Sequence, residues 1–315
     1  MKFAAHRVPG LVVVAAAILL GVTLGSPAAT LTLLPDADTM LSEYFPENNF
    51  GAMPFANSGS TRMLTRNRAL FRFDVAGHLP AGARIRSASL ILEVVGQPAE
   101  PFASGRFNLH RLLKPWGEGT KTNAPGGGAG QGSPATTGEA TWTHRFAFTT
   151  NTWTSPGAAA TNDFVAEPSS GVTVFGVDQS PYTIPSADRL VADLQLWLDQ
   201  PATNFGWILV CEHEGTPFTA RRFGTREDPL NAPRLEIEYD LPVRIDSVQR
   251  AGTQTTLSFL VEPGWVYTVE FANGLPPGGW QSLAHISPAS QPLRVSVTDF
   301  TPAPQRFYRL VRRMP

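Results

Sequence analysis

Short runs in which hydrophobic and polar residues alternate follow one another along most of the chain. Residues 68–75 and 106–112 have this period of two, and residues 87–95 are rich in β-forming side chains. Turn sequences such as Leu79-Pro80-Ala81-Gly82 separate the runs. Similar runs occupy residues 172–177, 205–212 and 234–239. Many short strands separated by turns predict an all-β chain built as an antiparallel sandwich, and we expect it to be jelly-roll-like.

One segment has the period of a helix instead. Its apolar residues recur at intervals of three and four: Leu190, Val191, Leu194, Trp197 and Leu198. The sequence from Ser186 to Arg189 is typical of a helix N-terminus, and Pro201 cannot continue a helix. We therefore expect one helix that lies on the sandwich, with Trp197 in the core.

The pattern changes near Leu241-Pro242-Val243, which divides the chain into two units. Residues 29–240 are expected to form the sandwich, and residues 243–315 a small second β domain. Strands of the second unit are expected at residues 255–261, 267–271, 280–285, 293–298 and 307–311. Within the first unit, residues 117–139 contain a Gly-rich run with little side-chain area to bury, which predicts a flexible loop.

Residues 1–28 have the three parts of a secretory signal peptide. Basic residues come first, residues 11–24 are apolar and uncharged, and Ser26-Pro27-Ala28 offers small residues for cleavage. The apolar run is shorter than the roughly 20 residues of a membrane span. We expect a secreted or cell-surface protein with no membrane segment after cleavage; an uncleaved anchor helix is the alternative.

The composition limits the classes of molecule that this protein can bind. The net charge is −1 and charged residues make up 16% of the chain, whereas a nucleic-acid binder shows a concentrated basic face. We therefore expect no nucleic-acid partner. The one cysteine, Cys211, ends the apolar run Trp207–Cys211, so we expect a buried thiol and a fold that does not rely on disulfides.

Several short motifs follow one another along the first unit. They are Ala37-Asp38-Thr39, Asn49-Phe50-Gly51, the runs 68–74 and 79–83, Trp116-Gly117-Glu118, the run 204–207, Arg226-Glu227 and the run 232–235. Their order and spacing resemble the DNRLRE domain, a bacterial secreted β-sandwich also classed as carbohydrate-binding module family 96. The resemblance implies a sandwich that binds a glycan, and some members of that family bind alginate-like acidic polysaccharides.

The second unit carries its own set of motifs, at residues 267–271, 279–283, 297–299 and 306–310. Their order resembles the small fibronectin-type-III-like module common at the ends of exported proteins in Verrucomicrobia-like bacteria. This resemblance implies a spacer or an attachment role.

Aromatic side chains in polar surroundings are candidate sugar platforms, because sugars bury their C–H faces on Trp and Tyr rings. The candidates are Trp116, Trp142, Trp153, Tyr44 and Tyr182. Trp142 and Trp153 are the better ones, since threonines flank both. The alternative is that these rings pack loops against the sandwich.

Arginines are candidate partners for the carboxylates of an acidic polysaccharide, which a guanidinium can hold with two hydrogen bonds. The candidates are Arg72, Arg221 and Arg222, with Arg62, Arg66 and Arg68 in the same set. The alternative is an ordinary solvated sheet face with ion pairs.

Asp36, Asp38 and Asn48 are oxygen donors near one edge of the expected sandwich. Ca²⁺ takes about 6–8 oxygen ligands, some from the backbone. We expect either no cofactor or a structural Ca²⁺ held by these residues; turn and capping roles explain them equally well. Arg226-Glu227 and Glu118 are expected to form internal ion pairs.

The sequence has no nucleophile elbow, no His-Glu-x-x-His and no phosphate-binding loop. We therefore expect a non-catalytic protein that binds a polysaccharide at the cell surface or in the matrix. One alternative is a structural surface protein that binds no sugar, which buried or ion-paired Trp and Arg side chains would favour. The other alternative is a polysaccharide lyase or hydrolase. Its catalytic acids and bases would then come from residues such as Glu139, Asp163, Glu167, His110 or His144.

Overall fold

The computed structural model describes residues 29–99, 102–126, 128, 130–275, 278–301, 303 and 305–313. The expected all-β sandwich fold is confirmed: strands make up 43% of the structure and helices 6%, and the sheets are antiparallel. The expected signal peptide lies outside the described residues. Among the residues that are described, no helix is long and apolar enough to cross a membrane.

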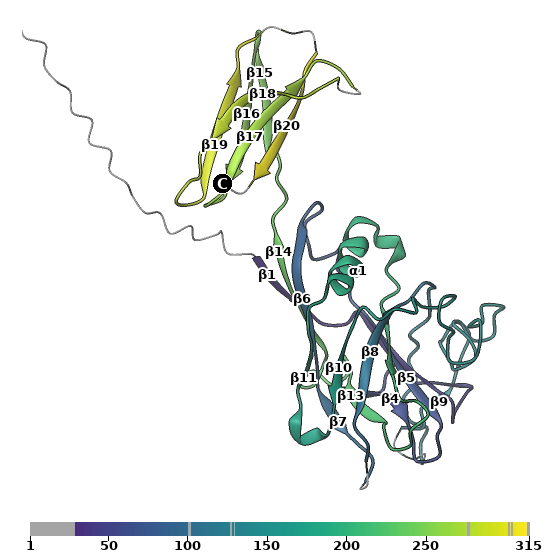
Figure 1. Ribbon diagram of the computed structural model, residues 1–315. Helices are drawn as coiled ribbons and strands as arrows, with labels where there is room; N and C mark the ends of the chain where they lie inside the picture. The colour runs from purple at the N-terminus through teal and green to yellow at the C-terminus, as the bar shows by residue number, and fades with distance from the viewer. Residues whose placement is uncertain are drawn as a thin grey trace, which may run out of the picture. The chain divides into compact units, whose positions relative to one another are not determined.

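The chain divides into two compact units, with the boundary between Val243 and Arg244. In the first unit, coloured purple to green in Figure 1, a four-stranded and an eight-stranded sheet are the main layers. The smaller sheet has the order β1 (Ala29–Leu33), β14 (Arg234–Asp240), β6 (Arg84–Leu92) and β11 (Tyr182–Ile184). The larger sheet has the order β10 (Ser170–Val174), β8 (Gly105–Arg111), β12 (Trp207–Cys211), β5 (Arg66–Arg72), β4 (Phe55–Ser60), β13 (Arg221–Gly224) and β7 (Val94–Gly96), and β2 (Ala37–Ser42) pairs with β5.

The larger sheet buries both of its faces, and each face has its own apolar cluster. Successive side chains of a strand point to opposite faces, so in β5 Phe71 belongs to the inner cluster between the sheets and Leu70 to the cluster on the other face. We call the second set the outer cluster; it comprises Ala37, Leu41, Leu70, Leu112, Trp116, Ala140, Trp142, Trp153, Ala158, Phe164 and Ile208. Burial on both faces explains why β12 is apolar at every position.

The expected helix is confirmed as α1 (Asp188–Asp199), and Trp197 is fully buried. Its N-terminus differs from the expectation, because Ala187 is the capping residue and makes no side-chain cap. Ser186 instead accepts a hydrogen bond from the backbone N–H of Ala88 in β6. Gln195 binds the same strand, accepting from the N–H of Ile85 at 3.0 Å. Short 3₁₀ turns lie at η1 (Val177–Gln179) and η2 (Pro201–Thr203).

The Gly-rich run expected to be a flexible loop makes defined contacts in its described part. The side-chain oxygen of Asn123 accepts the backbone N–H groups of Gly130, Gln131 and Gly132 at 3.0–3.1 Å. Strand β9 (Ser133–Pro134) then pairs with β3 (Asn48–Asn49). A single side chain that gathers three N–H groups holds a turn that has almost no apolar area to bury.

The second unit consists of two three-stranded antiparallel sheets. One has the order β15 (Ser247–Ala251), β16 (Gln254–Val261) and β19 (Leu293–Asp299), and the other β18 (Gln281–Ile286), β17 (Val266–Ala272) and β20 (Phe307–Arg313). The five expected strands are confirmed to within about two residues at each end. Strand β15 is an addition, since its sequence Ser-Val-Gln-Arg-Ala has no clear alternation.

Candidate ligand-binding site

The three tryptophans expected to be sugar platforms are buried. Trp116, Trp142 and Trp153 are 5%, 4% and 3% exposed and belong to the outer cluster. The indole N–H of Trp116 donates to the carbonyl of Phe205 at 2.8 Å, and that of Trp153 donates to the carbonyl of Thr141 at 3.0 Å. The platform prediction is wrong for these three residues, because their rings supply the apolar area that covers the outer face of the sheet.

Neighbouring groups enclose the ring of Trp142. The guanidinium carbons of Arg66 and Arg68 lie 5.3 and 5.9 Å from its centroid. Gly157 has a φ of +85° and lies so near that a Cβ there would be 2.4 Å from a ring atom. Arg68 also donates to the carbonyls of Gly157 and Ala158 and is ion-paired with Glu214 at 2.7 Å. These contacts attach the segment that contains Trp142 and Gly157 to β5, and they enclose the ring of Trp142 within the protein.

Two of the three main candidate arginines are held by the fold. Arg221 is 1% exposed and donates to the backbone carbonyls of Ala103, Phe175 and Ala220. Its predicted role in ligand binding is wrong, because its donors already satisfy buried carbonyl groups. Arg72 forms an ion pair with Asp36 at 2.8 Å on a half-exposed face, as the alternative of a solvated sheet face expects.

The expected calcium ligands do not come together. Asp36 is paired with Arg72, and the side-chain amide of Asn48 donates to the carbonyl of Gln131 at 2.8 Å. Asp38 instead lies with Glu118 and Glu227, and one carboxylate oxygen of each lies within 4.8 Å of the others. The grouping predicted from sequence is therefore wrong, because neighbours along the chain point their side chains to different partners.

The acidic trio, Asp38, Glu118 and Glu227, is arranged around Arg226. The guanidinium of Arg226 donates to both carboxylate oxygens of Glu118 at 2.8 and 2.9 Å and lies 3.2 Å from Glu227. Its backbone N–H donates to Asp38 at 2.9 Å. The internal ion pairs expected for Arg226, Glu227 and Glu118 are thus confirmed.

Asp38 is almost fully buried, and its pKa is raised to about 8. Desolvation is the main cause, and the charges of Glu227 and Glu118 add to it against the hydrogen bond from Arg226. At neutral pH Asp38 therefore carries a proton that it can donate to Glu227, whose Oε2 is buried without a hydrogen-bond partner among the described residues. Ca²⁺ takes about 6–8 oxygens, whereas both oxygens of Glu118 and one of Asp38 already accept N–H groups, so the trio fits a shared proton and Arg226 better than a cation.

Of the carboxylates and histidines considered for catalysis, all but the exposed Glu167 have structural partners in the described part of the chain. Asp163 is fully buried, is ion-paired with Lys114 at 2.9 Å and accepts the N–H groups of Thr154 and Ala159. His110 is buried beside the carbonyl of Val165 at 3.0 Å, and burial lowers the pKa of its imidazole.

A concave surface opens elsewhere on the first unit, near the tip of the β4–β5 hairpin. Two adjoining hollows of about 600 and 190 Å³ share the lining residues Asn57, Thr61, Arg62 and Asn67. We call them together the sandwich groove. The remaining described lining residues are Ser42, Tyr44, Phe45, Met63, Thr65, Gly96, Gln97, Pro98, Ala99, Gly130, Phe218, Ala220, Arg221 and Arg222.

The hairpin tip is a short, well-braced turn. The backbone N–H of Thr61 donates to the carbonyl of Thr65 at 3.0 Å, their hydroxyls are 2.6 Å apart, and Leu64 has a φ of 62°. This geometry leaves Arg62 and Met63 exposed. Arg62 makes no hydrogen bond or ion pair with any other residue that the structure describes, so its guanidinium is available.

The groove also contains two side-chain amides that have no hydrogen-bond partner among the described residues. Asn67 is 4% exposed, and its side-chain amide makes no hydrogen bond within the described part of the chain. Asn57 on the neighbouring strand is half-buried, and its side-chain amide likewise makes no hydrogen bond within the described residues. The polar atoms of both amides stay accessible to solvent at the hollow, so the two residues mark a place where a polar molecule can bind.

Four sequence candidates line the groove: Tyr44, Arg62, Arg221 and Arg222. Tyr44 is 54% exposed and makes an edge-to-face contact with Phe45, at 4.7 Å between centroids. The guanidinium carbon of Arg222 lies 4.4 Å from the ring centroid of Phe55. Gly96 leaves room for this arginine, because a Cβ there would be 2.8 Å from its Cδ.

Asn57 and Asn67 were missed in the sequence. Their signal was present, because asparagine is disfavoured inside strands and both lie within segments that otherwise read as β4 and β5. The sequence could not predict that the two asparagines lie close together, since this depends on the register of the hairpin.

No model of a known protein family matches the chain, and no curated protein matches it either. The resemblances to the DNRLRE domain and to the fibronectin-type-III-like module therefore stay predictions.

Proposed function

We propose that the protein is an exported, non-catalytic carbohydrate-binding protein and that the sandwich groove holds an acidic polysaccharide. The unpaired amide of Asn67 carries the proposal, because sugar hydroxyls both donate and accept the hydrogen bonds that such an amide needs. The exposed ring of Tyr44 offers a surface for a C–H face of the sugar.

The charge of the groove supports an acidic ligand. Its charged lining residues are arginines, and none of the lining residues that the structure describes is acidic. Arg62 can hold a carboxylate by two parallel hydrogen bonds. Single sugar sites bind weakly and gain apparent affinity when several act on one polymer, which fits a protein that acts at a cell surface or in a matrix.

Retardation in native gels that contain a polysaccharide tests this proposal. We expect alginate or pectin to retard the protein, a neutral glucan to leave its mobility unchanged, and EDTA to have no effect. Arg62→Gln and Asn67→Ala should each weaken binding about tenfold or more, because each leaves a polar group of the bound ligand without its partner. Arg189→Gln, an exposed arginine on α1, is the matched control and should bind like the wild type.

A structural surface protein is the second candidate function. The burial of Trp116, Trp142 and Trp153 and the internal hydrogen bonds of Arg221 favour it, since these residues hold the fold together. The same gels decide between the two candidates. If alginate, pectin, xylan, fucoidan and glucan all leave the mobility unchanged, the glycan-binding proposal fails and the structural role stands.

A further inference from the structure

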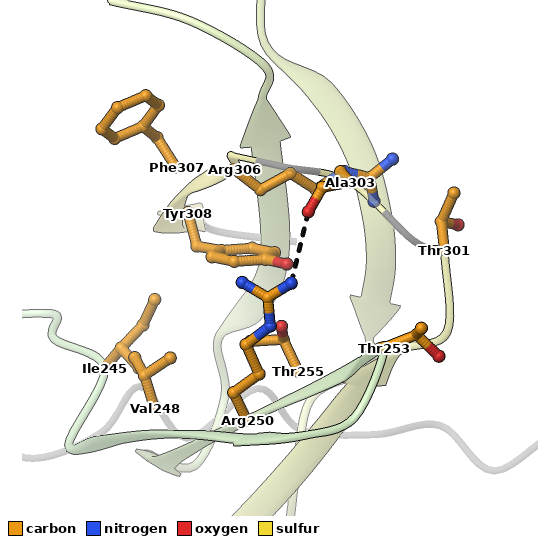
Figure 2. A pocket seen from close by; sticks show the side chains of 10 residues that line it. All are labelled: Ile245, Val248, Arg250, Thr253, Thr255, Thr301, Ala303, Arg306, Phe307 and Tyr308. Carbon is orange, nitrogen blue, oxygen red and sulfur yellow. Dashed lines mark hydrogen bonds between the residues drawn. The ribbon is translucent and has the colours of Figure 1, made fainter.

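The second unit has a pocket of about 460 Å³ at the side where its two sheets present edge strands. Strand β15 lines it with Val248 and Arg250, and strand β20 with Phe307 and Tyr308. Within the described residues, β15 pairs with β16 alone and β20 with β17 alone. We call this the C-terminal pocket; Figure 2 shows its ten lining residues.

One of the two arginines of the pocket is neutralised by the fold. Arg306 is ion-paired with Asp299, which is 1% exposed, and Tyr308 donates to the same carboxylate at 3.0 Å. Arg306 also donates to Asn273 at 3.2 Å and lies 4.0 Å from the ring centroid of Phe271. Its charge and its donors are therefore used within the unit.

Arg250 is different. It is exposed, and its guanidinium contacts two backbone carbonyls, of Gly252 at 3.4 Å and of Ala303 at 3.5 Å. Hydrogen bonds of this length are weak. Figure 2 shows the guanidinium extending into the pocket beside the ring of Tyr308. Arg250 thus gives the pocket a positive charge that an anion can bind with shorter, charge-assisted hydrogen bonds.

The rest of the lining divides into a polar and an apolar part. Thr253, Thr255 and Thr301 supply hydroxyl groups. Val248, 59% exposed, and the ring of Tyr308 supply apolar surface. A sugar acid has the matching groups: one carboxylate, several hydroxyls and an apolar C–H face.

We propose that the C-terminal pocket is a second sugar site, which binds the carboxylate of a uronic acid residue through Arg250. This inference rests on the proposed glycan binding and adds to it a separate site in the other unit. Two sites in one chain raise the apparent affinity for a polymer long enough to reach both.

Calorimetric titration of the full chain with trigalacturonate tests the inference. We expect two sites per chain, and about tenfold weaker binding of the methyl ester, which lacks the negative charge. Arg250→Gln should remove one site and leave the other. Thr253→Val, an exposed turn position, should weaken that same site and provides a second variant if Arg250→Gln folds poorly. Arg294→Gln, an exposed arginine of the same unit that does not line the pocket, is the control.

The outcomes separate this inference from the proposed function. If Arg62→Gln removes all binding while Arg250→Gln titrates like the control, the C-terminal pocket is no sugar site and the sandwich groove stands. If Arg250→Gln removes all binding, the pocket stands and the groove fails. An absence of binding in the wild type overturns both. Tighter, Arg250-dependent binding of tetraglutamate would overturn the assignment to a sugar in favour of an acidic peptide.

Discussion

At the scale of single residues, Asp38 shows how burial changes the chemistry of a common side chain. Its carboxyl is almost fully buried between two other acids, and its pKa is raised to about 8. A carboxyl that is protonated in the folded state and ionised in the unfolded state makes stability depend on pH. Because the folded-state pKa is the higher one, the stabilisation is complete below about pH 4 and is lost as the pH rises through about 8.

We therefore expect the wild type to lose stability between pH 4 and 8 relative to Asp38→Asn, whose side chain is neutral throughout. Each pKa unit corresponds to about 1.4 kcal/mol, so the two curves should diverge by a few kcal/mol. Urea denaturation at a series of pH values measures the difference. Parallel curves over this range would show that Asp38 is ionised in the folded protein.

At the scale of elements, the long segment between β8 and β10 determines which aromatic residues reach the surface. It crosses the outer face of the larger sheet, and its tryptophans complete the outer cluster. Because they cover that face, Trp116, Trp142 and Trp153 are buried and offer no platform to a ligand. The surface that we propose for ligand binding lies instead at the hairpin tip between β4 and β5, where Arg62 is exposed.

This arrangement predicts that Trp153→Ala lowers the stability of the first unit rather than only its ligand affinity. The expected cost is about 3–5 kcal/mol, the range for deleting a buried large aromatic ring. Phe148→Ala, in the same segment but 73% exposed, should change stability by less than about 0.5 kcal/mol. Denaturant unfolding followed by circular dichroism compares the two; equal costs would contradict the burial of Trp153.

At the scale of the whole molecule, each unit has its own hydrophobic core. Phe71 is fully buried in the first and Phe259 in the second. Units with separate cores can unfold separately. Phe259→Ala should therefore increase hydrogen exchange in residues 244–313 and leave residues 29–243 protected, and Phe71→Ala should do the reverse. Exchange measured by mass spectrometry checks this, and a loss of protection across both units in either variant would show one cooperative fold.

Much of the fold could be predicted from the sequence, because the evidence for it is local. Alternation predicts the strands, the 3- and 4-residue spacing predicts α1, and the change near Leu241 predicts the second unit. Strand β15 was not predicted, since an edge strand that is half or fully exposed needs no hydrophobic pattern.

Less of the candidate site could be predicted, because the type of a residue does not say which way its side chain points in the folded protein. Trp142, Trp153 and Arg221 have the chemistry of sugar-binding residues but point into the protein, where apolar area and buried carbonyls require them. Tyr44 and Arg222 have the same chemistry and line the sandwich groove.

The sequence alone thus determined the all-β class, the helix, the order of the strands along the chain and the buried state of Cys211, since each follows from spacing between near neighbours. The tertiary structure decided which polar groups meet. The acidic trio joins residues up to 189 positions apart (227 − 38), and the groove places Asn57 and Asn67 beside Arg222 through strand register. Contacts of this kind depend on how strands pair, and pairing is a property of the folded chain.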